Sequence, residues 1–527
     1  MSKFNRTTTR PAVHSPIVTS STPTGRTHEG APAFVREAKG ELFLLAVANL
    51  VGENTFYEQA SDRDSRFRDL VHQVAVDDAG WMLEFVTWLR AEANMRSAPL
   101  VAAAEAVHAR LAAAQGTRPS DVVFNDTANR ALINAALQRA DEPGELLAYW
   151  TSRYGRRIPK PVKRGVGDAV RRLYNERNLL KYDTDSKGFR FGDVVDLVHP
   201  TPSAPWQADL FRHALDRRHG RGDEVPAGLE MLAANRTLRA AAAVDPSVLL
   251  LPGRLAEAGM TWEDALSLAG SRVDKAALWS ALIPSMGIMA CARNLRNFDE
   301  AGVTDAVAAQ VIARFADAEQ VARSRMFPFR WLAAYRHAPS LRWAYPLEQA
   351  LNASLANVPA LPGRTLVLVD QSPSMFPGFY YSTPTKSDIT LADQAKIFGT
   401  AIALRAKDAT VAQYGNTSEL VTIPKGGSVL PLLDRYRMLN GTDTWAAMRQ
   451  HYNGHDRVIV VTDEQTRPGQ DPIPTNVPVY TWNLGGYKHG QAPSGTGQRH
   501  TFGGLTDQAF RMISLLEAGR DGSWPWQ

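Results

Sequence analysis

The chain has 527 residues, 44% of them hydrophobic, and this length is too great for one compact core. Its net charge of +5 is small for that length, so total charge alone does not indicate a nucleic-acid partner. The single cysteine, Cys291, excludes a disulfide within the chain and favours a reducing compartment. No segment approaches the roughly 20 apolar residues that span a bilayer, and no apolar signal segment follows the N-terminus. We therefore expect a soluble, cytoplasmic protein with no membrane partner.

The first two thirds of the chain have a helical pattern. Residues 1–28 are rich in Thr, Ser, Pro and Arg, which predicts a disordered N-terminal arm. Over residues 29–360, many amphipathic helices with short connections predict stacked helix pairs of the HEAT-like kind. In one of them Trp81, Phe85, Trp88 and Leu89 share a helix face. Similar stripes occur at 101–114, 130–140, 206–218, 228–242, 273–293 and 303–323.

Residues 361–527 have a different pattern, in which short apolar strands alternate with helices. This order predicts an α/β, Rossmann-like domain with an open, mainly parallel sheet and one antiparallel edge strand. Ligands of such sheets bind at the carboxyl ends of the strands. The predicted strands are Thr365–Val369, 409–414, 418–423, Val458–Val461 and 477–483, and the predicted helices are 393–407, 442–452 and 506–518.

Oxygen-bearing side chains follow two of these strands. Asp370-Gln371-Ser372-Pro373-Ser374 forms a D-x-S-x-S motif, and Asp463 ends a later strand. Gly441-Thr442-Asp443 opens a helix between them. Carboxylates and hydroxyls are the ligands that Mg²⁺ takes, so the spacing predicts a divalent-cation site. The alternative is that Ser and Asp only cap the next helix.

This pattern resembles the metal-ion-dependent adhesion site of von Willebrand factor A domains. The resemblance implies that Ser372, Ser374 and Thr442 bind the ion directly. Asp370 and Asp463 would act through water, and the open position would accept a partner's carboxylate or phosphate oxygen. Two departures are the insertion at residues 376–388 and the extra rim carboxylates of Asp443 and Glu464.

The site offers no evident general base, which catalysis of hydrolysis would need. The lone histidine near it, His455, is expected to be a surface residue. We therefore predict a binding protein and not an enzyme.

Positive charge is concentrated in residues 152–190. This segment carries 12 Lys or Arg and four acids, a net charge of +8. Tyr154, Tyr174, Tyr182 and Phe189 are interleaved, as stacking on unpaired bases would require. The alternative is a solvated helical face.

Scattered motifs follow one another in order between about residues 30 and 350. They are Asn49–Tyr57, Lys163-Arg164-Gly165, Tyr174–Arg177, Lys181-Tyr182, Asp193–Pro200, Leu295-Arg296-Asn297 and Phe327-Pro328-Phe329. Together they resemble the TROVE module of the Ro autoantigen family. The resemblance implies a closed ring of helical repeats that binds noncoding Y-like RNA on a basic outer face and ends of misfolded or single-stranded RNA in its hole. It also implies an exoribonuclease partner and a monomeric protein. By residue matching, the resemblance implies that Lys163, Arg164, Lys181 and His199 contact RNA. With Arg171, Arg172 and Tyr182 of the basic segment, they are the predicted RNA contacts.

A second hypothesis is a metal-dependent protein-interaction adaptor. Here the α/β domain, as in chelatase-type partners, would bind an acidic protein through Mg²⁺, and the helical part would be a scaffold.

Overall fold

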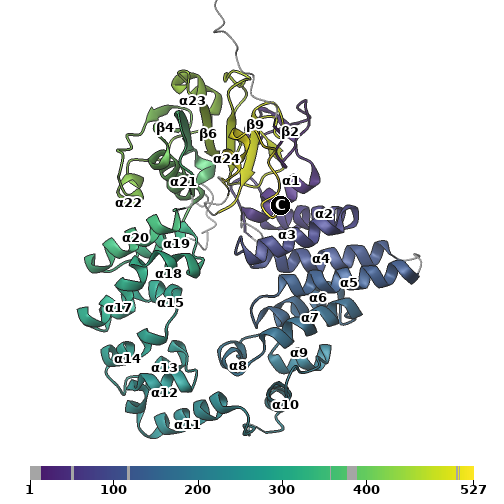
Figure 1. Cartoon of the computed structure of the whole chain (residues 1–527), viewed down its shortest axis with the longest axis vertical. Coiled ribbons are helices and arrows are strands. Elements are labelled where there is room, and N and C mark those ends of the chain that lie inside the picture. The colour runs from purple at the N-terminus through teal and green to yellow at the C-terminus, as the bar shows by residue number, and fades with distance from the viewer. Residues whose placement is uncertain are drawn as a thin grey trace, which may run out of the picture. The chain divides into compact units, whose positions relative to one another are not determined.

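In a computed structural model, the protein consists of two compact units (Figure 1). One unit contains residues up to 70 together with 321–336 and 344–527, and we call it the sheet unit. The other contains 71–320 and 337–343, and we call it the helical unit. The structure describes residues 13–48, 53–114, 119–222, 224–356, 358–376, 389–505, 509 and 511–527. The first residues of the Asn49–Tyr57 motif and most of the insertion at 376–388 lie outside these ranges.

The helical unit consists of packed helices, as the sequence pattern predicts. Helices α2 (Ala60–Asp77) and α18 (Ala318–Ser324) each have residues in both units. The other elements are α3 (Ala79–Ala91), α4 (Ser97–Ala113), α5 (Pro119–Ala136), α6 (Glu142–Tyr154), α7 (Lys160–Leu173), α8 (Glu176–Tyr182), α9 (Phe191–Val198), α10 (Pro205–His219), α11 (Glu230–Val244), η1 (Pro246–Leu250), α12 (Pro252–Glu257), α13 (Trp262–Ala269), α14 (Lys275–Leu282), η2 (Ile283–Ser285), α15 (Ile288–Arg293), α16 (Leu295–Glu300), α17 (Asp305–Ala316) and η3 (Leu341–Trp343).

Buried apolar stripes hold these helices together. Trp81, Phe85, Trp88 and Leu89 are all buried, which confirms the predicted stripe on α3. Helix α5 packs against α3, α4 and α7 (Figure 1). The stripe at 273–293 is divided between α14 and α15, because Pro284 between them cannot donate a helical hydrogen bond.

The sheet unit has a six-stranded sheet in the order β5-β4-β3-β6-β7-β9. Neighbouring strands are parallel except β4 and β5, which confirms the predicted antiparallel edge. The strands are β3 (Arg364–Asp370), β4 (Asp408–Tyr414), β5 (Ser418–Leu420), β6 (Arg457–Thr462), β7 (Val479–Asn483) and β9 (Arg499–Gly503). The other elements that follow residue 320 in this unit are α19 (Pro328–Arg336), α20 (Ala344–Ser354), η4 (Pro373–Met375), α21 (Leu391–Arg405), α22 (Val429–Leu433), α23 (Thr444–His451), β8 (His489–Gly490) and α24 (Arg511–Glu517).

Helices pack against the central strands and bury their apolar residues. Trp445 and Met448 of α23 join a core cluster with Leu366 of β3 and Val458 of β6. The ring of Phe398 on α21 lies 4.0 Å from that of Trp482 on β7. The central strands are therefore buried, as their unbroken apolar runs predict.

The N-terminal residues 13–48 belong to the sheet unit, which corrects the predicted domain boundaries. Strands β1 (Gly25–Arg26) and β2 (Pro32–Val35) pair with each other, and β2 also pairs with β8. Val13 and Ile17 are buried, so residues 13–28 are not the predicted disordered arm; residues 1–12 lie outside the described ranges. These long-range contacts are invisible to local composition.

Helix α1 (Ala38–Val47) anchors the N-terminal residues to the sheet unit. It is apolar on nearly all sides, and its residues Gly40–Val47 are buried. Leu44 of α1 closely approaches Gly503 of β9, where a larger side chain would collide with it. An all-round apolar helix must be covered, and here the sheet unit covers it.

Among the described residues, no helix is both long and apolar enough to cross a membrane.

Candidate functional site

The predicted metal ligands gather at the carboxyl ends of two adjacent parallel strands. Asp370 is the last residue of β3, and Asp463 directly follows β6, which pairs with β3. Ser372 and Ser374 lie in the loop after β3, with their Oγ atoms 3.2 Å apart. Thr442 precedes α23, and its carbonyl oxygen accepts a hydrogen bond of 3.0 Å from the backbone nitrogen of Arg467, in the loop after Asp463. The side chains of all five predicted ligands are buried.

Asp370 is held by several donors. Its Oδ1 accepts from the Ser372 backbone nitrogen at 2.9 Å, and its Oδ2 accepts from Thr462 Oγ1 at 2.6 Å. Burial nevertheless raises the pKa of Asp370 above its usual range, because these hydrogen bonds do not fully replace water.

The buried carboxylate of Asp463 is stabilised by fewer hydrogen bonds than that of Asp370. Its Oδ1 accepts from the Gln465 backbone nitrogen at 3.1 Å, whereas its Oδ2 is buried and has no hydrogen-bond donor among the described residues. Burial and then the nearby Asp370 carboxylate raise the pKa of Asp463 well above its usual range. Two adjacent buried carboxylates with one orphaned oxygen are the environment that a cation would stabilise.

The additional carboxylates do not crowd the rim as the sequence suggests. Glu464 is buried, pairs with Arg36 and accepts a 2.6 Å hydrogen bond from Asn483 Nδ2. Its backbone φ of 65° is rare for a non-glycine residue, and these two contacts hold it there. Asp443 caps α23 by accepting from the Ala446 backbone nitrogen at 2.8 Å.

The donor set at this edge suits a small hard cation. The described residues contain no group of three or more His, Cys, Asp or Glu that could hold a metal ion. The oxygens come instead from hydroxyls and two carboxylates, a set that leaves room for the waters that Mg²⁺ retains. His455 is buried, whereas the sequence predicts a surface residue. It precedes the amino end of β6, and its Nε2 lies 3.0 Å from Thr410 Oγ1.

The basic segment presents one charged face of α7. Lys160, Lys163, Arg164 and Arg171 are spaced at i, i+3, i+4 and i+11, so they lie on one side of the helix, and we call them the basic stripe. Buried residues such as Val162, Val166 and Val170 occupy the other side. Gly165 allows α5 to approach, because a Cβ at this position would lie 2.6 Å from the Arg130 carbonyl oxygen.

Seven of the twelve cations in the segment make no ion pair or hydrogen bond through their side chains within the described part of the chain. They include Lys160, Lys163 and Arg171 of the basic stripe, and all but Lys163 are exposed. Uncompensated exposed cations supply the charge that phosphates bind. The full set is Arg156, Arg157, Lys160, Lys163, Arg171, Arg177 and Lys181, the last of which has only a cation–π contact with Tyr182.

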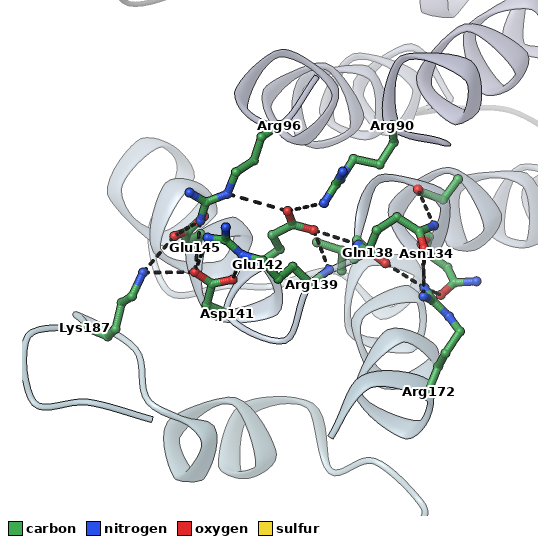
Figure 2. Close-up of polar contacts among 12 residues, drawn as sticks. Arg90, Arg96, Asn134, Gln138, Arg139, Asp141, Glu142, Glu145, Arg172 and Lys187 are labelled. Atoms are coloured by element: carbon green, nitrogen blue, oxygen red, sulfur yellow. Dashed lines mark hydrogen bonds and ion pairs between the residues drawn. The ribbon is translucent and has the colours of Figure 1, made fainter. Parts of the chain in front are cut away.

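Other cations of the segment are paired within the protein. Lys187 Nζ lies 3.1 Å from Asp141 Oδ2 and 3.0 Å from Glu145 Oε1, in a network that also contains Arg96 and Arg139 (Figure 2). Arg164 NH1 pairs with Asp126 Oδ2 at 2.7 Å. Such pairs reduce the charge available to a ligand.

Arg172 ties α7 to the end of α5. Its guanidinium donates to the Leu137 carbonyl oxygen at 2.7 Å and to Asn134 Oδ1 and Gln138 Oε1, each at 3.1 Å (Figure 2). These carbonyl and amide acceptors are structural partners. Of the predicted RNA contacts, Arg172 is the one most fully engaged within the protein.

The remaining predicted contacts lie near the ends of short helices. Lys181 Nζ lies 5.2 Å from the ring centroid of Tyr182, and the Arg139 guanidinium lies 5.4 Å from the same ring. His199 caps α9 in the left-handed conformation with φ of 49° and is exposed. Its backbone nitrogen, and not its side chain, bonds to the Val195 carbonyl oxygen.

The interleaved aromatics are less available than the sequence pattern suggests. Tyr174 is buried and stacks on Phe191 with ring centroids 3.7 Å apart. Tyr154 stacks on His108 and donates a 2.6 Å hydrogen bond to Glu105. Tyr174 therefore belongs to the core and cannot stack on a base, so this part of the prediction is wrong.

Two comparisons with known proteins bear on this chain. Residues 254–341 match the TROVE domain family, and this range includes two of the quoted motifs, Leu295-Arg296-Asn297 and Phe327-Pro328-Phe329. The crystal structure of the Ro (RSR) protein of Deinococcus radiodurans matches 88% of this chain and 96% of its own, with a TM-score of 0.58 and 18% identity. The chain has the fold of a Ro protein. A comparison with curated protein sequences finds no match.

The Ro-type fold confirms two predictions from the sequence. The resemblance to the Ro family is confirmed by the TROVE match and the shared fold together. The fold class, a helical repeat-like part and a Rossmann-like α/β part, is confirmed as well. The basic stripe lies outside the TROVE match at 254–341.

Proposed function

We propose that this protein binds structured noncoding RNA of the Y-like class through the basic stripe of α7 and the cations beside it. The observation that carries the proposal is the set of exposed cations around α7 that have no partner among the described residues. Phosphate contacts from such residues give affinity without much sequence discrimination. The TROVE match and Ro-type fold support the same conclusion.

The wider role follows from the resemblance to the Ro family. In this proposal the protein is a monomeric, cytoplasmic and non-catalytic component of RNA quality control or processing. It also engages ends of misfolded or single-stranded RNA, and an exoribonuclease is tethered to it through the bound RNA.

A charge-reversal pair tests the RNA proposal. Lys160→Glu and Lys163→Glu together change two unpaired cations in the first turn of α7, where acidic residues also suit the helix dipole. We expect weaker binding to a structured small RNA, and a salt dependence whose logarithmic slope is smaller by about 1–2.

The matched control reverses charge in the first turn of other helices. Lys275→Glu on α14 and Arg254→Glu on α12 change exposed cations outside the basic segment. The proposal predicts little change for this pair. Equal RNA affinity and equal salt slope for both pairs and the unmodified protein would contradict it.

The predicted metal ligands at the carboxyl ends of β3 and β6 favour a second candidate function, a Mg²⁺-dependent adaptor for an acidic protein. Its supporting observation is the buried Asp463 Oδ2 that lacks a donor among the described residues. When bound, the cation would supply an open coordination position to a partner oxygen, while Ser372, Ser374 and Thr442 hold it. Protein capture that is lost in Ser374→Ala and unaffected by nuclease would support this function, and nuclease-sensitive capture would contradict it.

A further inference from the structure

The loop between α9 and α10, residues 199–204, borders the basic stripe. At its start, Pro200 lies next to Gly167, with its Cβ 3.9 Å from where a Cβ on Gly167 would be. Beyond its end, Gln207 Nε2 donates to the carbonyl oxygens of Arg171 at 3.0 Å and Tyr174 at 3.1 Å. Because Gly167 and Arg171 are one helical turn apart, the loop is fixed along α7 at both ends.

Gln207 is the anchor of this arrangement. Its side chain is fully buried, and its Oε1 accepts from the Ser203 backbone nitrogen at 2.8 Å and from Ser203 Oγ at 2.9 Å. The bonds to the Arg171 and Tyr174 carbonyl oxygens hold the first turn of α10 against the carboxyl end of α7, and the two bonds from Ser203 join the loop to the same side chain. The residue before Gln207 is therefore next in sequence to a side chain that is bonded to the backbone of Arg171.

That residue is Trp206, which is 41% exposed. Among the described residues its ring makes no aromatic contact and its indole N–H no hydrogen bond. Pro205 at the start of α10 restricts the backbone that presents it. An exposed indole on a rigid turn loses little conformational freedom when a flat ligand stacks on it.

The charge around Trp206 indicates what that ligand is. Arg171 is exposed and has no side-chain partner among the described residues, and it lies on the basic stripe with Lys160 and Lys163. A positive track next to an aromatic platform is the arrangement that binds single-stranded nucleic acid. A protein partner for the indole would need acidic groups to match the same cations.

We propose that Trp206 is a stacking platform for an unpaired base of RNA whose phosphates lie on the basic stripe. This inference rests on the proposed RNA-binding function and adds to it a preference for single-stranded segments beside α7. In this proposal Trp206 has the base-stacking role that the sequence pattern assigns to Tyr174, which is buried. Stacking alone is tolerant of base identity, so the platform selects unpaired bases and not a sequence.

The test compares two probes on the full-length protein, a short oligouridine and an adenine–uridine RNA duplex of the same length. Trp206→Ala should weaken oligouridine binding about tenfold. It should leave duplex affinity unchanged. Trp206→Phe, which keeps an aromatic face, should recover most of the loss. The control Tyr345→Ala removes a ring that is 66% exposed on α20 and should have no effect on either probe.

The variants separate this inference from the function on which it rests. If Lys160→Glu with Lys163→Glu weakens both probes while Trp206→Ala changes neither, RNA binding stands and the stacking platform is overturned. If the charge pair changes neither probe, the proposed function itself fails. Equal loss of both probes in Trp206→Ala also overturns the platform, and thermal unfolding of each variant checks that it is folded.

Discussion

Asp463 combines full burial, a neighbouring carboxylate and one oxygen with no donor among the described residues. Removing its charge should therefore relieve repulsion in the metal-free protein while removing a group that supports the cation. We predict that in a chelator Asp463→Asn has a melting temperature equal to or above that of the unmodified protein. Added Mg²⁺ should then raise the melting temperature of the unmodified protein only.

The control for this prediction is Asp443→Asn at the same edge. Asn caps a helix about as well as Asp, so α23 should keep its N-terminal cap. This variant should retain most of the Mg²⁺-dependent rise in melting temperature. An equal rise in Asp463→Asn would show that Asp463 does not support the ion.

The pKa of Asp141 is shifted downward, in the opposite direction to that of Asp463. Burial by itself would raise the pKa of Asp141, but Arg139, with Arg96 and Lys187, lowers it to about 2 (Figure 2). Because the folded pKa lies below the unfolded value near 4, Asp141 contributes stability above that value and loses it as pH falls from about 4 to 2.

Asp141→Asn should accordingly lower the free energy of unfolding by about 2 kcal/mol at neutral pH. Denaturant unfolding at neutral pH and near pH 2 measures this difference, which should shrink at the lower pH. The control Asp185→Asn changes a side chain that is 95% exposed and should shift stability by less than about 1 kcal/mol. A difference for Asp141→Asn that is the same at both pH values would contradict the assignment.

At the scale of elements, the two glycines of α7 differ in how closely neighbouring residues approach them. A Cβ on Gly165 would lie 2.6 Å from the Arg130 carbonyl oxygen and 2.7 Å from Ile133 Cβ on α5. Gly167, half a turn away, has its nearest neighbour, Pro200, at 3.9 Å. Gly165→Ala should therefore destabilise the protein by about 1–3 kcal/mol. Gly167→Ala should stabilise it by up to about 1 kcal/mol, because Ala is the better helix former.

Thermal unfolding of the two glycine variants gives a direct comparison within one helix. The expected shifts in melting temperature have opposite signs. Shifts of the same sign would mean that the α5–α7 contact does not depend on the missing side chain at residue 165.

Elements with a strong local signal are the ones that the sequence predicts well. The D-x-S-x-S motif and Asp463 follow continuous apolar runs, and parallel strands bring them to one edge. The sequence does not predict strand β9, because Arg499–Gly503 lacks a run of β-branched residues. The contacts of β2, β8 and α1 join residues more than 400 positions apart, so local periodicity cannot reveal them.

The sequence predicts the RNA surface less well, because a count of Lys and Arg does not show which of them form ion pairs or hydrogen bonds within the protein. Arg172 and Lys187 belong to the same basic segment as Lys160, yet they contact groups on and next to α5 and α6 (Figure 2). In the sequence, Trp206 is part of the apolar stripe at 206–218, and nothing there marks it as a ligand contact. Its exposure depends on how Gln207 fixes the turn, which is a tertiary feature.

For the whole molecule, we propose that a chain with a Ro-type fold carries RNA. The most direct measurement is to purify the full-length protein from the cells that make it, without nuclease and at low salt, and to sequence any RNA that accompanies it. We expect a discrete small noncoding RNA that is lost from the variant carrying Lys160→Glu and Lys163→Glu and kept by the one carrying Lys275→Glu and Arg254→Glu. Protein that is free of RNA at low salt, or that carries the same RNA in all three forms, would contradict it.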